Sequence, residues 1–300
     1  MRVTIFGTGA MACLFGARLA PVAEVVLVGT WAEALAAIRE HGIRVEGEPA
    51  GEARVTALTA DDPAPPADLA LVLVKAWQTG RVAVQLASHL ALGGLALTLQ
   101  NGLGNLEQLG PRARLGVTTV GATLLGPGHV RPGGSGVTHV AGPGWQADLL
   151  ERAGFETHVV PGDAVDGLLW GKLVVNCAIN ALTALLRVPN GELLRRPDAA
   201  LLMDEAAREC AAVAQAEGIR LPFTDPAAQA RRVAERTAIN QSSMFQDILR
   251  GAPTEIEAIN GAVARAGQAL NVPTPVNATL WRLVRAAVGG EASQVKLQPS

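Results

Sequence analysis

The sequence contains very little lysine, little cysteine and almost no net charge. Of the 25 lysine and arginine residues, only three are lysine, namely Lys75, Lys172 and Lys296. The three cysteines stand at no spacing typical of a metal site, which favours a reduced, cytoplasmic protein. A formal net charge of −2 gives no electrostatic reason to bind nucleic acid or an anionic membrane, so we expect neither as a partner.

Long apolar runs and metal-ligand patterns are also missing. We find no uninterrupted apolar segment of about 18 to 20 residues, and we therefore expect no membrane span. The first residues read as a strand leading into a glycine turn, which is unlike a signal peptide. His129, His139 and His158 lack ligand spacing, so we assign no metal to this chain.

Because lysine is rare in this chain, each lysine is a candidate for a function that arginine cannot perform. Arginine carries most of the positive charge here, but it cannot release a proton at neutral pH, whereas a partly buried lysine can. A position that keeps lysine therefore points to proton chemistry. Composition alone favours the simpler explanation, a GC-rich coding bias, so other observations must decide.

The first half of the chain alternates between short apolar strands and helices. We predict strands at 2–6, 25–28, 69–74 and 96–99, and helices at 11–19, 31–41 and 82–90. This alternation predicts a parallel, doubly wound α/β sheet. Residues 115–160, rich in Gly, Pro, Val and Thr, read as short strands and turns. From about 165 the pattern is helical, so we predict an α/β domain at 1–164 and an all-helical domain at 165–300.

A glycine turn connects the first predicted strand to the first predicted helix. Residues 7–12 read GTGAMA, an accepted form of the dinucleotide-binding fingerprint. Gly7 allows the tight turn, Gly9 lets the backbone approach a pyrophosphate, and the small Ala12 lets the helix pack closely. The helix N-terminus also offers unpaired amides to phosphate groups. The alternative is a turn with a purely structural role.

The end of the second predicted strand bears on the choice between NAD and NADP. A site that prefers NAD usually has Asp or Glu here for the ribose hydroxyls. Neither acid lies within two residues of Thr30, and no nearby arginine is present for a 2′-phosphate. Thr30 can donate one hydrogen bond, so the sequence leaves both cofactors open.

Polar residues follow two further strands at the predicted carboxyl edge of the sheet. Lys75 comes after the 69–74 strand, and Asn101 comes after the 96–99 strand. Open α/β sheets bind ligands at this edge, which favours a functional role for both residues. The alternatives are a surface lysine and an ordinary Asn-Gly turn.

The most informative pattern is a polar stripe on an otherwise apolar helix. Lys172, Asn176 and Asn180 stand at i, i+4 and i+8, so they share one helix face with a drift of about 40° per step. The residues around them are apolar, so this face is not simply solvated. Buried polar groups need partners, either another helix or a polar substrate.

Two later segments add polar candidates. Ser242 and Ser243 stand in a helix-like context. Thr254 and Glu257 have the spacing of a capping box, which predicts a helix start and places Glu255 in its first turn. The simple interpretation of Glu255 is a favourable first-turn acid.

Taken together, these segments resemble the 2-dehydropantoate 2-reductase (ketopantoate reductase) family over the whole chain. The resemblance rests on GTGAMA at 7–12, VKAWQ at 74–78, QNG at 100–102, GVTTVGAT at 116–123, WGKLVVNCAINALTAL at 170–185, PNGEL at 189–193, SSMFQD at 242–247 and TEIEAING at 254–261. It implies an N-terminal Rossmann domain, a helical C-terminal domain and an active site between them.

The resemblance also implies roles for individual residues. Lys172 matches the family's catalytic lysine, and Glu255 helps to order the catalytic site. The implied substrate contacts are Asn101, Asn176, Asn180 and Ser243. The implied cofactor positions are Gly7, Thr8, Gly9, Ala10, Met11, Ala12, Thr30, Lys75, Asn101, Ala122 and Glu255.

Two residues depart from the family pattern. Ala12 replaces the third glycine, which is harmless for helix packing. Thr30 stands where the family often has an arginine for the NADP phosphate. The resemblance therefore implies NADPH as the cofactor, while NADH use stays open.

The predicted activity is reduction of ketopantoate, a 2-oxo acid, to pantoate in coenzyme A biosynthesis. Hydride reaches the ketone carbon, and Lys172 stabilises the developing negative charge on oxygen and donates the proton. The alternatives are a related reductase of another 2-oxo acid or an opine-like compound, and a non-enzymatic NAD(P)-binding sensor. The sensor leaves the helix stripe unexplained. The apolar faces of the helical domain would permit a homodimer.

Overall fold

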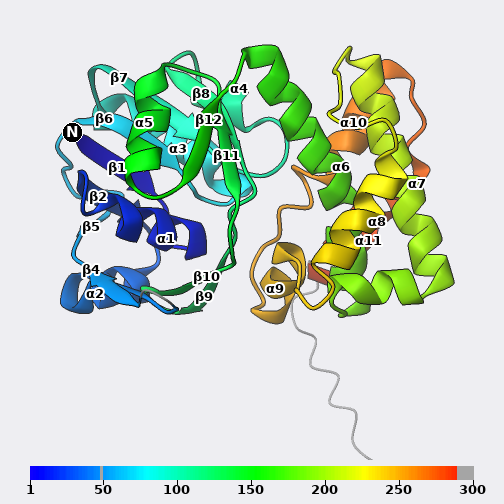
Figure 1. The fold of residues 1–300 in the computed structure, drawn as a ribbon, viewed down its shortest axis with the longest axis horizontal. Helices are drawn as coiled ribbons and strands as arrows, with labels where there is room; N and C mark the ends of the chain where they lie inside the picture. Colours follow the sequence, from blue (N-terminus) through cyan, green and yellow to red (C-terminus); the bar gives the residue numbers. More distant parts are fainter. Residues whose placement is uncertain (48–49, 289–300) are drawn as a thin grey trace, which may run out of the picture. The chain divides into compact units, whose positions relative to one another are not determined.

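The computed structural model describes residues 1–47 and 50–288, which form two compact units (Figure 1). The first unit is Met1–Leu169, and the second begins at Trp170. The long helix α6 (Gly162–Leu186) runs through this division. The predicted domain boundary after residue 164 falls within the same helix.

The first unit is built on an eight-stranded sheet. In order across the sheet, its strands are β12 (Glu156–Val159), β11 (Val137–Val140), β8 (Ala113–Thr118), β7 (Leu90–Thr98), β6 (Ala67–Val72), β1 (Arg2–Phe6), β2 (Glu24–Gly29) and β5 (Thr56–Thr59). The six strands from β8 to β5 pair in parallel, and β11 joins β8 in antiparallel fashion. Within the parallel part, chain order reverses beside β1, as in a dinucleotide-binding fold. The predicted α/β class is confirmed.

Helices cover this sheet, and a smaller sheet stands beside it. The helical segments are α1 (Ala10–Leu19), α2 (Ala32–His41), the 3₁₀ turn η1 (Ala76–Gln78), α3 (Thr79–His89), α4 (Asn105–Leu109) and α5 (Gly144–Arg152). The smaller sheet has the order β4 (Gly51–Ala53), β3 (Ile43–Val45), β10 (His129–Pro132) and β9 (Ala122–Gly126).

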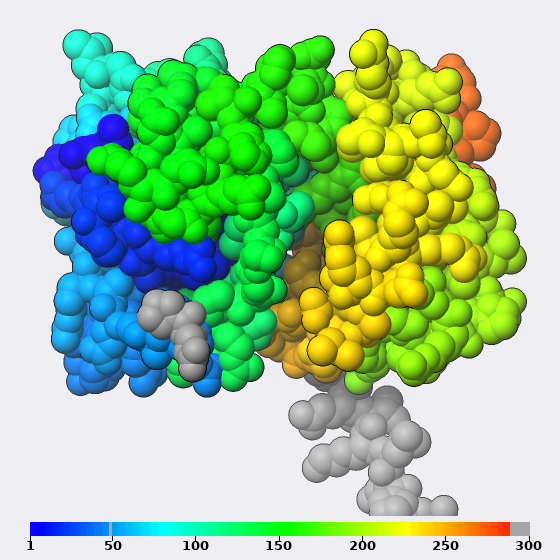
Figure 2. Space-filling view, in the orientation of Figure 1, coloured from blue at the N-terminus to red at the C-terminus, as the bar shows by residue number. Residues whose placement is uncertain are grey.

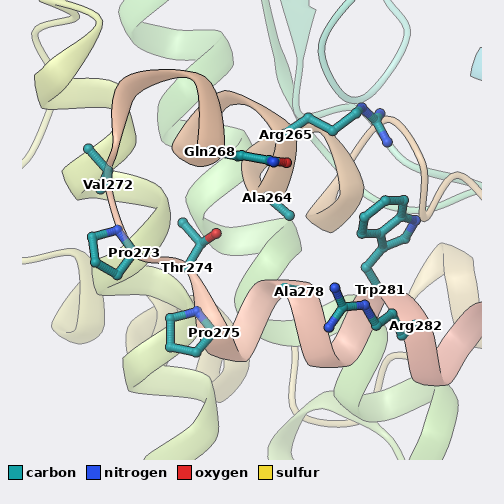
Figure 3. Close-up of a pocket in the computed structure, with 10 residues that line it drawn as sticks. All are labelled: Ala264, Arg265, Gln268, Val272, Pro273, Thr274, Pro275, Ala278, Trp281 and Arg282. Atoms are coloured by element: carbon teal, nitrogen blue, oxygen red, sulfur yellow. The ribbon is translucent and has the colours of Figure 1, made fainter.

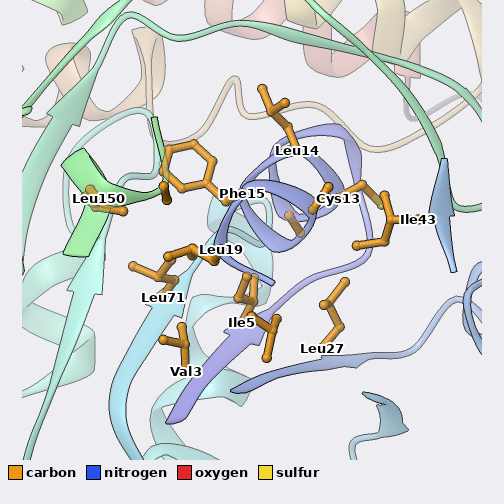
Figure 4. Packing of buried hydrophobic residues seen from close by; sticks show 14 of the residues in the cluster. Val3, Ile5, Cys13, Leu14, Phe15, Leu19, Leu27, Ile43, Leu71 and Leu150 are labelled. Atoms are coloured by element: carbon orange, nitrogen blue, oxygen red, sulfur yellow. The ribbon is translucent and has the colours of Figure 1, made fainter. Parts of the chain in front are cut away.

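The core of the first unit lies on both faces of the main sheet. Helix α1 is buried on one face, where Phe15 and Leu19 belong to the same cluster as Ile5 and Leu71 of the central strands (Figure 4). Phe15 stacks on Phe155 with a centroid distance of 4.0 Å. Helix α3 covers the opposite face through Val82 and Leu86. Burial of side chains of this size stabilises the fold by roughly 1.5–3 kcal/mol each.

Helix α5 corrects the interpretation of residues 115–160 as strands and turns only. Its side chains Leu149 and Leu150 are fully buried in the same core as α1. The helix is only nine residues long and follows Pro143, so its apolar period is short and easily lost in a Gly- and Pro-rich stretch. It covers part of the unit's surface near α1 (Figure 2).

The second unit is helical, as predicted, in the part of the chain that the structure describes. After α6, its segments are η2 (Asn190–Arg195), α7 (Pro197–Ala216), α8 (Pro226–Arg236), α9 (Ser243–Leu249), α10 (Asn260–Leu270) and α11 (Pro275–Val288). Arg231 of α8 donates two hydrogen bonds of 2.8 Å to the carboxylate of Asp204 on α7. This bidentate pair fixes the relative register of the two helices.

Helix α6 revises the expectation about apolar length. It is long and apolar enough, by length and composition, to cross a membrane, although Lys172, Asn176 and Asn180 interrupt its apolar sequence. However, 67% of its most apolar window is buried inside the fold. Core helices pass the same test, so a single such helix is weak evidence for a membrane span.

The predicted helix start at Thr254 and Glu257 is wrong. Residue 254 has no regular structure, residue 255 lies in a bend and residues 256–259 form turns, so α10 begins only at Asn260. The Glu255 carbonyl accepts hydrogen bonds from the amides of Ala258 and Ile259. Glu255 therefore lies in a bend five residues before α10 and not in the first turn of that helix.

Candidate functional site

Several predicted cofactor residues of the first unit follow neighbouring strands at the carboxyl edge of the main sheet. The turn after β1 is joined to both neighbouring strands, since the Gly7 amide donates to Val28 and the Leu73 amide donates to Phe6. Thr30 follows β2 directly, and Lys75 follows β6. The strand order therefore brings together segments that are far apart in the chain.

The glycine turn has the geometry that a pyrophosphate site requires. Gly7 has φ of +130°, and a Cβ there would lie 3.1 Å from the Leu73 carbonyl oxygen, so only glycine fits without strain. Gly9 is the N-cap of α1, so no N-cap side chain accepts a hydrogen bond from the first amides of this helix. A Cβ on Gly9 would meet no atom of the described residues within 4 Å. This open space above uncapped helix amides fits a phosphate group.

A buried hydrogen-bond network joins the Lys75 segment to the Asn101 segment. The Gln100 side chain donates to the Val74 carbonyl at 3.0 Å and to the Thr79 hydroxyl at 2.8 Å. The Thr79 hydroxyl donates to Asn105 Oδ1, whose amide nitrogen donates to the Asn101 carbonyl at 3.0 Å. The network therefore fixes the backbone of the two loops that follow β6 and β7, at Val74 and at Asn101.

Sequence reasoning missed these three positioning residues, Thr79, Gln100 and Asn105. They are less than a tenth exposed, and buried amides with satisfied hydrogen bonds hold loops in one conformation. In the sequence, these residues were signalled only by the two side-chain amides, Gln100 and Asn105, that flank the Asn101-Gly102 turn. Ala122, a predicted cofactor position, begins β9 of the smaller sheet, four residues after β8 ends.

The predicted polar stripe of the second unit lies on α6. Asn180 is buried, whereas Lys172 and Asn176 are half-buried. Fully buried apolar residues such as Val174 lie between them on the helix, and Cys177 carries no disulfide. The stripe therefore presents one cation and two amides from an apolar surface.

Burial changes the acidity of Lys172. Loss of hydration disfavours the charged ammonium and lowers the pKa of Lys172 to about 8, and the nearby carboxylate of Glu255 opposes that shift. Glu255 is itself buried, at 5% exposure. The structure thus brings two predicted residues, 83 positions apart, into electrostatic contact. A lysine with this pKa exchanges its proton near physiological pH.

The start of α9 is attached to α6 next to Asn180. Ser242 caps α9 by accepting from the Phe245 amide, and its hydroxyl lies 2.7 Å from that of Thr183. Ser243, the predicted substrate contact, is the first residue of α9 and is exposed. Ser242 and Thr183 are thus positioning residues, which the sequence showed only as neighbours of predicted ones.

A second buried amide network anchors the segment that carries Glu255. Asn260 donates to the Cys177 carbonyl on α6 at 3.1 Å and to Asn277 Oδ1 at 3.0 Å. Asn277 in turn donates to the carboxylate of Glu209 on α7 at 2.8 Å. Both asparagines are fully buried. They hold the 255–260 segment against α6, which keeps Glu255 near Lys172.

A surface pocket of about 420 Å³ lies elsewhere in the second unit (Figure 3). It is formed by α10, α11 and their connection, with Trp281 and two arginines, Arg265 and Arg282, at its edge. None of its lining residues is a predicted site residue. Arg265 is engaged by the carboxylate of Glu257 at 2.9 Å. Among the described residues, no cluster of three metal-ligating side chains occurs.

Two family models match this chain in succession. Residues 3–144 match "Ketopantoate reductase PanE/ApbA", and residues 164–288 match its C-terminal counterpart. The chain belongs to the ketopantoate reductase PanE/ApbA family. The resemblance inferred from sequence motifs is therefore confirmed.

Curated relatives agree over nearly the whole length. The chain is 38% identical to a 2-dehydropantoate 2-reductase of Archaeoglobus fulgidus, over 96% of this chain and 98% of the relative. It is 39% identical to a 2-dehydropantoate 2-reductase of Halobacterium salinarum, over 96% and 99% respectively.

Solved structures show the same architecture. A PanE/ApbA family ketopantoate reductase from Ralstonia eutropha matches with a TM-score of 0.89 at 36% identity, over 96% of this chain and 99% of that one. A D-mandelate dehydrogenase in complex with NADH and anilino(oxo)acetate matches with a TM-score of 0.90 at 30% identity and the same coverage.

The two glycines of the turn provide a matched pair of substitutions. We expect Gly9→Ala to leave the free energy of unfolding within about 0.5 kcal/mol of wild type, because its methyl group contacts no protein atom. If Gly9 faces the pyrophosphate as predicted, the variant should nevertheless weaken NAD(P)H binding by about tenfold or more, since the methyl group would take the space of a phosphate. Gly7→Ala should instead destabilise the fold by roughly 1–3 kcal/mol.

Urea unfolding and calorimetric titration with NADPH and with NADH measure the two effects separately. Wild-type affinity in the Gly9→Ala variant would contradict the proposed phosphate position.

Proposed function

We propose that this protein reduces 2-dehydropantoate to pantoate with NADPH as the preferred hydride donor. The observation that carries the proposal is Lys172, a half-buried amine whose pKa is lowered to about 8 on a helix that also carries Asn176 and Asn180. The family and the names of its relatives support the same reaction. A non-enzymatic NAD(P)-binding sensor would have no function for this lysine.

The proposed cofactor site uses the sheet edge of the first unit. The backbone of residues 7–12 would bind the pyrophosphate, and Thr30 and Lys75 would contact the adenosine end, with Asn101, Ala122 and Glu255 as further cofactor contacts. A bound nicotinamide supplies the hydride that the ketone carbon accepts. The residues fit such a group because Gly9 leaves open space in front of uncapped amides.

Lys172 would supply the proton. As hydride adds to the ketone carbon, the carbon–oxygen double bond opens and charge develops on oxygen. The ammonium stabilises that charge and then transfers one proton to it, leaving a neutral amine that regains a proton from solvent. Arginine at this position would supply charge but no proton.

Neutral amides suit the other polar groups of the substrate. Asn101, Asn176 and Asn180, with the Ser243 hydroxyl, would bind its carboxylate and hydroxyl groups without adding a charge that competes with Lys172. Glu255 would act through Lys172, because its carboxylate favours the protonated amine against the cost of burial.

The chemistry implies a small-molecule 2-oxo acid substrate and a biosynthetic setting. We infer that the protein works in the cytoplasm, where its three free cysteines stay reduced. A homodimer formed through the helical unit stays a prediction.

A second candidate function is reduction of a different 2-oxo acid. The match to a D-mandelate dehydrogenase favours this alternative, because that protein shares the fold and binds NADH. An aromatic 2-oxo acid such as phenylglyoxylate would then be the better substrate.

A substrate panel separates the two candidates. We expect kcat/KM for ketopantoate to exceed that for phenylglyoxylate by at least about 100-fold, which corresponds to roughly 2.7 kcal/mol of transition-state binding. The oxidation of NADPH, and of NADH in parallel, is followed by absorbance. A preference for phenylglyoxylate, or no turnover of ketopantoate with either cofactor, would refute the main proposal.

Substitution of Lys172 tests the proton donor. Lys172→Met and Lys172→Arg should each lower kcat by about 10²–10⁴-fold, because neither side chain can donate a proton at neutral pH. Both variants should keep wild-type affinity for NADPH within a few-fold, measured by fluorescence titration. A Lys172→Arg variant with near wild-type kcat would show that charge alone suffices.

The pH dependence follows from the lowered pKa of Lys172. Reduction requires the protonated amine, so kcat/KM should fall above about pH 8, tenfold for each further pH unit. Glu255→Gln removes the carboxylate that favours the ammonium, so this fall should begin at a lower pH. An alkaline limb that stays in place in Glu255→Gln would exclude the electrostatic role of Glu255.

A further inference from the structure

The end of β2 leaves little freedom for the residue that recognises the ribose of a dinucleotide. A Cβ on Gly29 would lie 2.6 Å from Thr8 Cγ2, and Thr8 is buried, so a larger side chain does not fit at this position. Thr30, the next residue, is exposed and carries only a hydroxyl. Neither residue offers the carboxylate that holds both ribose hydroxyls in NAD-preferring sites.

An arginine from another part of the chain reaches this position. Arg81 Nη2 lies 3.5 Å from the hydroxyl oxygen of Thr30, although the two residues are 51 positions apart. Arg81 belongs to the first turn of α3 and is exposed. Its guanidinium group therefore stands beside the residue where an arginine for the 2′-phosphate is missing.

The packing of α3 explains why this contact forms. Val82, next to Arg81, is buried against a cluster that includes Phe6 of β1 and Val28 of β2. One turn further on, Gln85 donates to the Ala60 carbonyl beyond β5 at 3.3 Å. The start of α3 is thus fixed over the ends of β1 and β2, and Arg81 is placed by a buried helix face.

The charge of Arg81 is available for an anion. Asp62, in the loop after β5, is paired with other groups, since its carboxylate accepts from the Thr59 amide at 2.7 Å and from Arg39 at 3.3 Å. That pairing lowers the pKa of Asp62, with the Thr59 hydrogen bond as the main cause. In the part of the chain that the structure describes, no carboxylate forms an ion pair with Arg81.

We infer that Arg81, with the Thr30 hydroxyl, recognises the 2′-phosphate of NADPH and sets the preference for NADPH over NADH. A guanidinium group matches phosphate oxygens with two parallel hydrogen bonds, and the hydroxyl of Thr30 adds a third donor. The inference rests on the proposed function, in which the sheet edge binds a nicotinamide dinucleotide.

Binding of nucleotide fragments to the full-length protein tests this role without catalysis. The probes are 2′,5′-ADP, which carries the 2′-phosphate, and 5′-AMP, which lacks it, both measured by isothermal titration calorimetry. Arg81→Gln should weaken 2′,5′-ADP binding by about 10- to 100-fold and change 5′-AMP binding by less than about threefold. The wild-type preference for 2′,5′-ADP should also fall with rising salt.

Two matched variants serve as controls. Arg152→Gln removes an exposed arginine from α5 in the same unit and should leave both affinities unchanged. Arg81→Lys keeps the charge and should retain part of the preference, because lysine lacks the two-pronged geometry.

Three outcomes would overturn the role of Arg81. They are an unchanged affinity of Arg81→Gln for 2′,5′-ADP, an equal loss for both fragments, and a wild-type protein that prefers 5′-AMP. Steady-state assays with NADPH and NADH should repeat the same shift in kcat/KM. A protein that binds 2′,5′-ADP through Arg81 but does not reduce ketopantoate would refute the proposed reaction and leave the inference intact.

Discussion

An ammonium group partly removed from water on an apolar helix is unstable unless something nearby favours its charge. In the second unit that group is Lys172, and the carboxylate of Glu255 supplies the opposing influence. The surrounding structure keeps Glu255 near Lys172, because Asn260 attaches the Glu255 segment to the helix that carries Lys172. A lysine held near the midpoint of its titration can give and regain a proton at physiological pH.

In the first unit, the main structural requirement is that several loops at one edge of the sheet keep a fixed conformation. Parallel strands end at the same edge, so residues from distant parts of the chain meet there. The buried network of Thr79, Gln100 and Asn105 then fixes two of those loops with satisfied amide hydrogen bonds. Removing one member would leave buried partners unpaired, at a cost of about 1–3 kcal/mol.

Local patterns in the sequence predicted the strongly periodic elements and failed at the short ones. The glycine turn at Gly7 and Gly9 and the helix with Lys172 were predictable, because their signals lie within one turn or one helix. Helix α5 was missed because nine residues give too little period. The Thr254 capping pattern was misleading, because α10 begins only at Asn260, whose side chain is held by a tertiary hydrogen bond to the Cys177 carbonyl.

By itself, the sequence determined the fold class, the family, the dinucleotide turn and the polar stripe of α6. The family follows from the resemblance of short motifs and the other features from spacing along the chain, so none of them needs knowledge of distant contacts. Only the tertiary structure decided which groups stand beside Lys172 and Thr30. Glu255 and Arg81 come from segments far along the chain, and strand order and helix packing alone bring them into place. The packing of α3 in this way places an arginine beside Thr30, which β2 itself does not provide.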